Sequence, residues 1–269
     1  MVDSSAQTEE PNKFLRFLWS GPVNISPYRW QLSWSFLTHL LKAVARQHHR
    51  EPAQNIQPFI PPDAVVFDLG AHAGQHTKLF ARLASRGQVY AFEPGAYARS
   101  ILRIAIWLHR LKNVVVLPVA VGSAYGMHTF TTPIKRARSV GFGLSHLGQP
   151  DRRWDAVTQE TVMTVALDEI VPALGLKRLD FIKADIEGWE VQMVIGAYKT
   201  LNKFRPALTL ELTKEGLARA NNRPEEAFEL LARIGYRGFD ISPTRHLVPV
   251  ETPSEGEFLF LPSRDGNVG

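Results

Sequence analysis

The fold is decided by residues 64–75, which read AVVFDLGAHAGQ. An apolar run ends at Asp68, Gly70 and Gly74 follow it, and an apolar helical pattern occupies residues 77–83. This order is typical of a buried strand, a tight turn and a helix. Because glycine lets a ligand approach the backbone closely, we expect the turn to be a ligand-binding site.

Strand and helix patterns alternate along the rest of the chain, which favours a parallel sheet covered by helices. The last apolar run, residues 257–261, follows a segment broken by Pro243, Pro249 and Pro253. A parallel return would normally need a crossover helix, so we expect this strand to be antiparallel. Further strands are expected at 87–92, 113–121, 161–165, 179–185, 206–212 and 236–241, with helices at 99–111, 167–174, 189–201 and 224–234.

Length and composition indicate one soluble α/β domain with an extension. The chain has 269 residues, of which 45% are hydrophobic and 21% are charged. Its net charge of +5 is spread along the sequence, which does not favour nucleic acid as a partner. The absence of cysteine excludes disulfides, thiolate metal ligands and a cysteine nucleophile.

Residues 1–61 form an extension ahead of a main domain at residues 62–269. Residues 1–13 read as a mobile tail, and the apolar spacing within 28–46 predicts an amphipathic helix. Four roles for this helix stay open: packing on the main domain, covering the substrate, contacting a second copy in a homo-oligomer, or lying on a membrane surface. A proline-rich linker at 51–62 leads into the main domain.

Neither an export signal nor a membrane span is predicted. The first residues are acidic and polar, whereas a secretory signal begins with basic residues and an apolar run. No stretch approaches the roughly 18 consecutive apolar residues of a membrane-spanning helix. We therefore expect a cytoplasmic protein.

The residues of the glycine turn discriminate between two nucleotide cofactors. His72 stands where the dinucleotide fingerprint G-x-G-x-x-G has its second glycine, so NAD is disfavoured. Asp68 can accept a hydrogen bond from an ammonium group, and Glu93, 25 residues further on, can accept bonds from both hydroxyls of a ribose. Together they suit S-adenosylmethionine, which has an amino-acid end, an adenosine end and no phosphate. The alternative is a structural turn beside an unrelated glutamate.

We expect the cofactor to contact residues at the ends of three successive strands. Asp68, Gly70 and Gly74 would hold its methionine end, Glu93 its ribose, and Ala120 faces the same edge of the sheet. The full set of expected cofactor contacts is Asp68, Gly70, Ala71, His72, Gly74, Glu93 and Ala120.

A second group of polar residues follows the strand predicted at 179–185. Lys183, Asp185 and Glu187 lie at its carboxyl end, the edge at which open α/β sheets bind ligands. We expect these three side chains to organise the acceptor of a reaction or its proton. Glu190 completes the group, and its alternative role is to favour the N-terminus of the following helix through the helix dipole.

Two weaker signals concern a metal ion and the substrate. Asp185 and Glu211 each lie at the end of one of two neighbouring strands, where they could bind a divalent cation such as magnesium through oxygen atoms. Residues 122–161 break the alternating rhythm, apart from a short strand expected at 128–131. Long insertions often determine specificity, so we place substrate contacts there, with His146 as the first candidate and a merely solvated histidine as the alternative.

Three of these segments, in this order, resemble the motifs of the FkbM family of S-adenosylmethionine-dependent methyltransferases. They are Phe67 to Ala71 with Gly74, Ala91 to Pro94, and Ile182 to Gly188. The resemblance covers about residues 62–262 and departs from the family pattern at His72, where asparagine is common. It implies a class I methyltransferase sheet, Rossmann-like, of about seven strands with the last antiparallel.

The resemblance also implies O-methylation of a small molecule or a sugar hydroxyl. In that reaction a substrate oxygen attacks the sulfonium methyl group, and the enzyme mainly supplies alignment and a route for the proton. Two other functions stay open from the sequence. The chain could be a non-catalytic cofactor-binding or partner-binding protein with this fold, or an NAD-dependent oxidoreductase.

Overall fold

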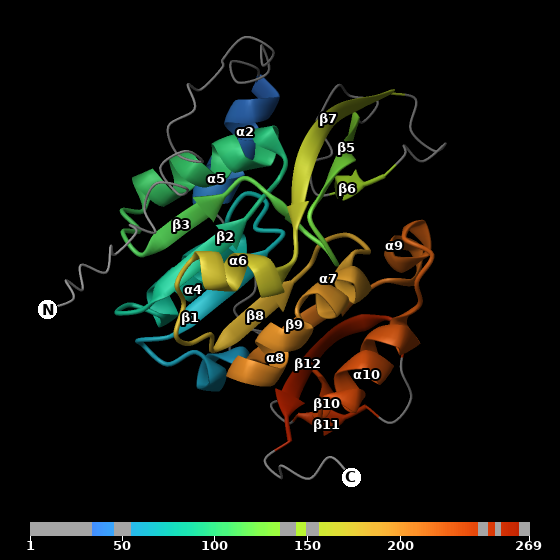
Figure 1. Cartoon of the computed structure of the whole chain (residues 1–269). Helices are drawn as coiled ribbons and strands as arrows, with labels where there is room; N and C mark the ends of the chain where they lie inside the picture. Colours follow the sequence, from blue (N-terminus) through green and yellow to red (C-terminus); the bar gives the residue numbers. More distant parts are fainter. Residues whose placement is uncertain are drawn as a thin grey trace, which may run out of the picture.

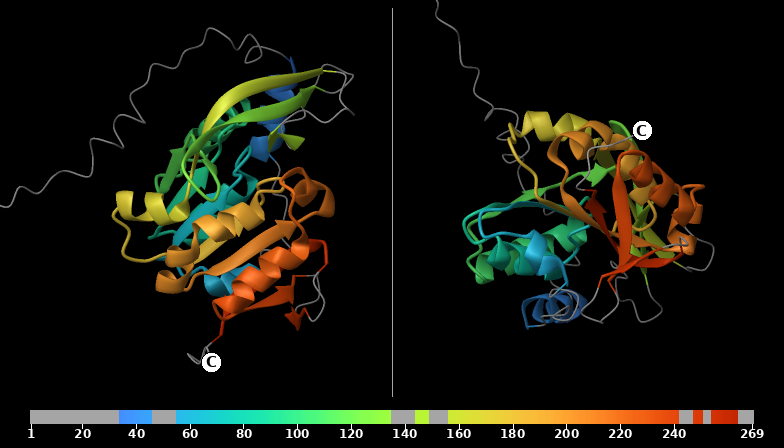
Figure 2. Two further views of the ribbon diagram at one scale, coloured as in Figure 1. Left: turned by 45° about the vertical axis from the view of Figure 1, so that its right-hand side comes forward. Right: turned by 90° about the horizontal axis from the view of Figure 1, so that it is seen from below.

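The computed structural model describes residues 34–45, 55–134, 144–148, 156–241, 247–250 and 254–263. Its centre is an eight-stranded sheet with helices on both faces (Figures 1 and 2). The order of strands across the sheet is β11-β10-β12-β9-β8-β1-β2-β3. Their bounds are β1 (Val65–Leu69), β2 (Gln88–Phe92), β3 (Val114–Leu117), β8 (Phe181–Ala184), β9 (Ala207–Leu212), β10 (Tyr236–Asp240), β11 (Val248–Pro249) and β12 (Gly256–Pro262).

The directions of the strands confirm the predicted topology. β1 pairs in parallel with β2 and β8, β2 with β3, and β8 with β9. β12 runs antiparallel to both of its neighbours, β9 and β10, as the proline-broken approach predicts. The main sheet contains the seven strands expected for this fold, and the two-residue β11 adds an eighth at the edge beside β10.

The apolar runs form strands that are buried on both faces of the sheet. Phe67 of β1 points into a large core with Phe92 and Ile182, while its neighbour Val66 packs on the opposite face against Phe80 and Phe181. This alternation is the two-residue period of a strand. Because the core is continuous on both sides, the carboxyl ends of β1, β2 and β8 are fixed relative to one another.

Helices cover the two faces of the sheet. α4 (Gln75–Leu83) and α5 (Ala96–Leu108) lie on one face, and α6 (Leu167–Ala173), α7 (Glu190–Gly196), α8 (Tyr198–Phe204) and α10 (Pro224–Arg233) lie on the other (Figure 2). The single helix predicted at 189–201 is therefore two helices, which meet at Ala197. The sequence prediction also missed α9 (Lys214–Arg219), whose first turn is capped by the Thr213 side chain accepting from the Gly216 N–H.

A second, four-stranded sheet stands beside the main one and corrects two predictions (Figure 1). It consists of β4 (Ala120–Val121), β5 (Gly126–Ile134), β6 (His146–Leu147) and β7 (Ala156–Val165) in the order β4-β7-β5-β6. The strand predicted at 113–121 ends at Leu117, because Pro118 has no N–H for the ladder, and the chain then joins the second sheet. The supposedly irregular insertion contains a long antiparallel hairpin of β5 and β7.

The amphipathic helix of the extension packs on the main domain. α2 (Trp34–Ala45) lies against α5, where the His39 ring nitrogen Nδ1 is 2.8 Å from the Tyr97 hydroxyl. The Phe36 ring meets the same tyrosine edge to face, and the Lys78 ammonium of α4 donates to the Ala43 carbonyl. The tail predicted at 1–13 and the first residues of the predicted helix lie outside the described residues. Within the described part of the chain, every helix is too short or too polar to cross a membrane.

Candidate active site

A sharp turn at the carboxyl end of β1 forms the floor of the site. The N–H groups of Gly70 and Ala71 both donate to the Phe92 carbonyl of β2, each at 3.0 Å. Gly70 has φ of +75°, and a Cβ atom there would lie 1.9 Å from the Asp185 carbonyl oxygen. Gly74, with φ of +87°, ends the turn and begins α4. The two predicted glycines are thus required by backbone conformation and, at Gly70, by close contact with the β8 loop.

Gly70→Ala is expected to lower the free energy of unfolding by at least about 3 kcal/mol and to abolish ligand binding, because the new methyl group would displace the Asp185 backbone. Gly175→Ala is the matched control, since Gly175 also has positive φ but has open space around its Cβ position. We expect the control to cost only about 1 kcal/mol. Chemical denaturation of both variants measures the difference, and equal losses would contradict this account of the turn.

Glu93 follows β2 and is held with its carboxylate at the wall of a pocket. Its side chain is buried, and it accepts hydrogen bonds from the N–H groups of His72 and Gly95, each at 2.8 Å. Burial raises the pKa of Glu93, although His72 and these two hydrogen bonds oppose the rise. The backbone bonds fix the orientation of both carboxylate oxygens, each of which can still accept a further hydrogen bond.

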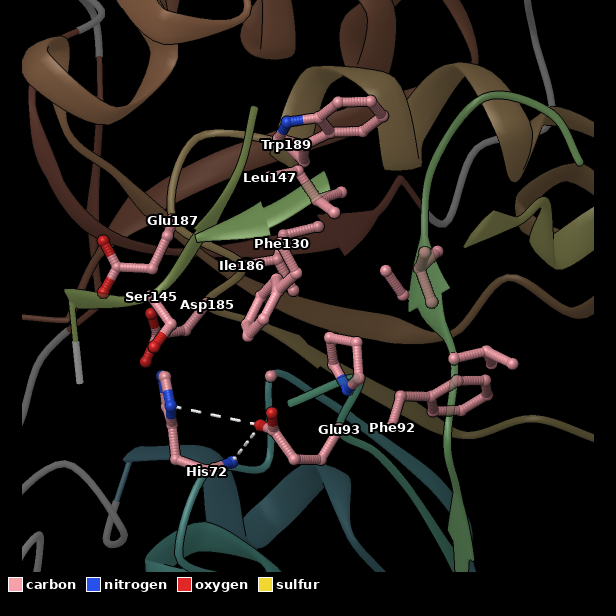
Figure 3. Close-up of a pocket in the computed structure, with 15 residues that line it drawn as sticks. His72, Phe92, Glu93, Phe130, Ser145, Leu147, Asp185, Ile186, Glu187 and Trp189 are labelled. Carbon is pink, nitrogen blue, oxygen red and sulfur yellow. Dashed lines mark hydrogen bonds and ion pairs between the residues drawn. The ribbon is translucent and has the colours of Figure 1, made fainter. Parts of the chain in front are cut away.

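The pocket beside Glu93 has mostly apolar walls (Figure 3). Its shape and lining suit a flat apolar ring carrying neighbouring hydroxyl groups. The second sheet and the β8 loop contribute walls that the sequence prediction did not include, because these contacts depend on long-range packing. The lining residues are Gly70, His72, Phe92, Glu93, Pro94, Val119, Ala120, Val121, Phe130, Ser145, Leu147, Asp185, Ile186, Glu187 and Trp189.

Asp68 lies beneath the turn and lines neither of the two pockets of the site. It is fully buried, its Oδ2 atom accepts a 2.5 Å hydrogen bond from the Thr77 hydroxyl, and burial raises its pKa. Its Oδ1 atom has no hydrogen-bond partner among the residues that the structure describes. Asp68 therefore anchors the start of α4 and keeps one acceptor atom unused.

A larger, polar pocket of about 1140 Å³ adjoins the first. Four residues line both pockets, namely Gly70, His72, Asp185 and Glu187. The shared wall is where a ligand in one pocket would meet a ligand in the other. The remaining lining residues of the polar pocket are Ala71, Gln75, His76, Lys183, Ala184, Thr209, Glu211 and Glu257.

Lys183 and Asp185 form a largely buried ion pair between β8 and its loop. The Lys183 Nζ atom donates to Asp185 Oδ2 at 3.0 Å. Burial alone would lower the pKa of Lys183, but the charges of Asp185 and Asp68 outweigh it and raise the pKa. Burial alone would raise the pKa of Asp185, but the Lys183 ammonium and His72 outweigh this effect and hold the pKa well below the usual range. Both groups are therefore charged at neutral pH.

The structure also brings Asp185 and Glu211 together, as the metal hypothesis requires, but their chemistry suits a shared proton. Although part of the Glu211 side chain faces solvent, desolvation and the negative charge of Asp185 raise its pKa to about 8. Glu211 is thus protonated at neutral pH and donates a hydrogen bond to Asp185. Asp185 also faces the Lys183 ammonium, so magnesium, which prefers ionised oxygen ligands, would compete here with a cation and a proton.

Glu187 lies at the mouth of the polar pocket on a strained turn. Its φ is +56°, and the next residue, Gly188, packs against the backbone of Gly216. Its carboxylate is 3.9 Å from the Arg219 guanidinium of α9, and burial together with the charge of Asp185 raises its pKa. Non-glycine residues adopt this conformation at a cost of about 1–2 kcal/mol, so the surrounding contacts hold it in place.

Glu190 lies in the first turn of α7 and also closes the preceding turn, a contact that was not predicted from the sequence. It is buried outside both pockets, and its Oε1 atom accepts a 2.9 Å hydrogen bond from the Ile186 N–H and a 3.4 Å bond from Gly188. The carboxyl group thereby closes the turn that carries Glu187. Burial raises its pKa to about 7, although the bond from Ile186 opposes the rise.

Glu190→Gln is expected to flatten the pH dependence of stability. The pKa of Glu190 is about 7 in the folded chain and 4.5 for a free glutamate. The folded chain therefore binds more protons between these values, and its free energy of unfolding falls as the pH rises from about 4.5 to about 7. This one group contributes at most about 3 kcal/mol to the fall.

Urea denaturation at several pH values between 4.5 and 7.5 measures the effect of Glu190→Gln. Glutamine keeps an acceptor for the Ile186 N–H but cannot ionise. Glu229→Gln, on the exposed side of α10, serves as the control and should leave the slope unchanged. The same slope in the wild type and in Glu190→Gln would contradict the assigned pKa.

His146, the first candidate for a substrate contact, points away from both pockets. It is buried in β6, with its Nδ1 atom 3.2 Å from the Leu144 carbonyl oxygen, and its neighbours Ser145 and Leu147 line the apolar pocket instead. Neighbouring residues of a strand face opposite sides, so the residues on either side of His146 reach the pocket and His146 does not. Neither sequence interpretation of His146, a substrate contact or a solvated side chain, matches its buried position.

The sheet order and the ligand pocket at the carboxyl ends of β1 and β2 define a class I methyltransferase fold. Residues 68–238, more than half of the sequence, match the Methyltransferase FkbM domain family. The chain therefore belongs to the FkbM methyltransferase family, as its three motifs predict.

Two curated proteins are similar to this chain. The AMB antimetabolite synthetase AmbE of Pseudomonas aeruginosa is 27% identical over 208 residues, which are 66% of this chain and 10% of that protein. The 2-O-methyltransferase NoeI of Sinorhizobium fredii is 27% identical over 153 residues, which are 54% of this chain and 61% of that protein. The chain thus spans a tenth of one relative and about three fifths of the other.

Two solved structures of methyltransferases align with this chain. The FkbM methyltransferase of Methylobacillus flagellatus KT has a TM-score of 0.47 and 13% identity, over 84% of this chain and 58% of that one. An SAM-dependent O-methyltransferase of Thermotoga maritima has a TM-score of 0.40 and 12% identity, over 81% of this chain and 67% of that one.

Proposed function

We propose that this chain uses S-adenosylmethionine to methylate a hydroxyl group of a small molecule or a sugar. The observation that carries the proposal is the position of Glu93. Its buried carboxylate faces an apolar pocket, and that pocket opens beside the Gly70 turn into a second, polar pocket. One pocket can therefore hold the methyl donor while the other holds the acceptor.

The apolar pocket fits the parts of the cofactor. Glu93 would accept hydrogen bonds from the ribose hydroxyls, and Ala120, Phe130 and Trp189 would enclose the adenine ring. The tight turn at Gly70, where a side chain has no space, would let the amino-acid end approach the backbone. When bound, the cofactor supplies an activated methyl group.

The methionine end would lie along the shared wall of the two pockets. Ala71 and His72 line the polar pocket, and the unused Oδ1 atom of Asp68 lies beneath this turn. Since Asp68 does not reach the pocket surface, we assign it an indirect role: holding the turn and drawing positive charge toward it.

Lys183, Asp185 and Glu187 would position the acceptor in the polar pocket. Their charged groups surround the opening between the pockets and can hold hydroxyl groups through charge-assisted hydrogen bonds. The main contribution of these residues is alignment of the attacking oxygen, which is worth several orders of magnitude in such displacements. A pocket lined with so many carboxyl groups suits a polyhydroxylated or amino-bearing acceptor better than an anionic one.

The similarity to the Sinorhizobium protein, which is named as a 2-O-methyltransferase, favours a hydroxyl group over other methyl acceptors. The polar lining agrees with a sugar-like acceptor, because hydroxyl groups need many hydrogen-bonding partners. Incubation with methyl-labelled S-adenosylmethionine and a panel of monosaccharides and methyl glycosides tests this. A labelled, base-stable methyl ether supports the proposal. Cofactor binding without any methylated product would favour a non-catalytic binding protein.

We propose that methyl transfer needs no magnesium, because the Lys183 ammonium already pairs with Asp185. We expect the rate of methyl transfer to stay within twofold of its original value after dialysis against excess EDTA. The rate is measured with and without EDTA, and then with added magnesium. Loss of activity that magnesium restores would contradict this assignment.

A further inference from the structure

His72 occupies the boundary between the two pockets in a conformation that non-glycine residues seldom adopt. Its φ is +45°, and its N–H group is fixed by the 2.8 Å hydrogen bond to Glu93. Figure 3 shows its ring extending from this anchored backbone toward Asp185. The imidazole therefore lies where a methyl group would pass from the apolar pocket to the polar one.

Carboxylates surround the His72 ring. Its Nδ1 atom is 4.0 Å from Glu93 Oε2, and one ring nitrogen lies within 4.8 Å of carboxylate oxygens of both Asp185 and Glu187. A proton on the imidazole would be attracted by all three groups. With 20% of its side chain exposed, the ring remains accessible from the pockets.

The other charged groups near the opening of the polar pocket already have charged partners. Asp185 is engaged by the Lys183 ammonium and the Glu211 carboxyl, and Lys183 is already protonated. Glu187 faces the Arg219 guanidinium. The His72 imidazole, by contrast, lies beside three carboxylates whose negative charges would stabilise a proton on it.

We propose that His72 is the general base that receives the proton of the acceptor hydroxyl group. This inference rests on the proposed methyl transfer. The acceptor oxygen forms a bond to the methyl carbon while the carbon–sulfur bond breaks, and its electron pair stays on sulfur. The hydroxyl proton moves to a ring nitrogen of His72, and Glu93, Asp185 and Glu187 stabilise the resulting imidazolium. The proton then leaves to solvent through the polar pocket.

A test must separate His72 from the other titratable groups that face it. These groups belong to other residues, so a substitution of His72 alone leaves all of them in place. They are Asp68 of β1, Glu93 after β2, His76 of α4, Lys183 of β8, Asp185 and Glu187 of the following loop, Glu211 of β9 and Glu257 of β12. Comparison of the wild type with His72→Asn isolates the contribution of the His72 imidazole.

The first experiment uses binding alone. S-adenosylmethionine carries a positive sulfonium, whereas S-adenosylhomocysteine is neutral at sulfur. The dissociation constant of S-adenosylmethionine divided by that of S-adenosylhomocysteine therefore reports the charge beside the transferred methyl group. In the wild type we expect this ratio to rise by about five- to tenfold as the pH falls from 8 to 5.5, because a charged imidazole repels the sulfonium. In His72→Asn this quotient should stay constant within twofold over the same pH range. His109 lies outside both pockets, so His109→Asn is the control and should behave as the wild type.

The second experiment measures turnover of the best acceptor from the sugar panel. His72→Asn should lower kcat by about 100-fold, leave KM for the cofactor within threefold, and remove the acidic limb of the pH profile of kcat. A raised cofactor KM with an unchanged pH profile would overturn the inference and make His72 a binding residue only. A pH-independent binding ratio in the wild type would overturn it as well. Failure of both cofactor forms to bind would instead contradict the proposed function itself.

Discussion

Glu93→Ala is expected to weaken the binding of S-adenosylhomocysteine by about 100-fold or more. The substitution removes two charge-assisted hydrogen bonds to the ribose hydroxyls. It also leaves the N–H groups of His72 and Gly95 without their present acceptor. Isothermal titration calorimetry of the full chain measures the loss.

Two further variants separate ribose recognition from a general disturbance. Glu93→Gln keeps one acceptor oxygen and should lose only about tenfold in affinity. Glu160→Gln is the matched control, because Glu160 also accepts from a backbone N–H, that of Ala96 at 3.0 Å, but lines neither pocket. Wild-type affinity in Glu93→Ala would show that the apolar pocket is not the ribose site.

Asp185→Asn is expected to lower kcat by about 100- to 1000-fold while the affinity for S-adenosylhomocysteine stays within a few-fold. Asp185 lies on the shared wall of the pockets, where its charge orients both Lys183 and the acceptor. A loss confined to kcat indicates an interaction made at the transition state rather than in cofactor binding. Steady-state kinetics and calorimetry on the same variant measure the two quantities.

The Asp185→Asn variant also leaves the buried Lys183 ammonium without its partner, which by itself destabilises the fold. The double variant Lys183→Met with Asp185→Asn removes both charges and should recover much of the lost thermal stability. Its activity should stay low, because the acceptor is no longer oriented. Recovery of activity together with stability would contradict the assigned role of Asp185.

The local features of the fold were predictable because they follow from short-range rules. The apolar run ending at Asp68 is buried from Val66 onward in β1, and Gly70 and Gly74 adopt the positive φ values that such a turn needs. The antiparallel last strand follows from the prolines in the segment before it, which disfavour a crossover helix there. The position of Glu93 follows from the rule that parallel strands end at the same edge.

The predictions that were wrong depend on contacts between distant parts of the chain. The β5 and β7 strands pair across a long insertion, and such pairing has no local signal beyond weak alternation. His146 is buried in β6, although the polar residues around it suggested an exposed loop. The break at Pro118 could have been predicted, because proline within a strand pattern argues against an unbroken strand.

The candidate site combines predictable residues with an arrangement that only the structure describes. Lys183 and Asp185 were recognised from their place at a strand end, but the proton shared between Asp185 and Glu211 depends on their proximity and desolvation. The sequence did not indicate that Trp189 and Phe130 form walls of the apolar pocket. Nor could it indicate that His72 faces three carboxylates, because these come from two separate segments.

Calorimetric titration of the full chain with S-adenosylhomocysteine, and separately with NAD, tests the central claim most directly. The account predicts that one molecule of S-adenosylhomocysteine binds per chain and that S-adenosylmethionine competes for the same site. It also predicts that Glu93→Ala abolishes most of the affinity and that NAD releases no heat of binding. Binding of NAD, or the absence of binding by S-adenosylhomocysteine, would contradict it.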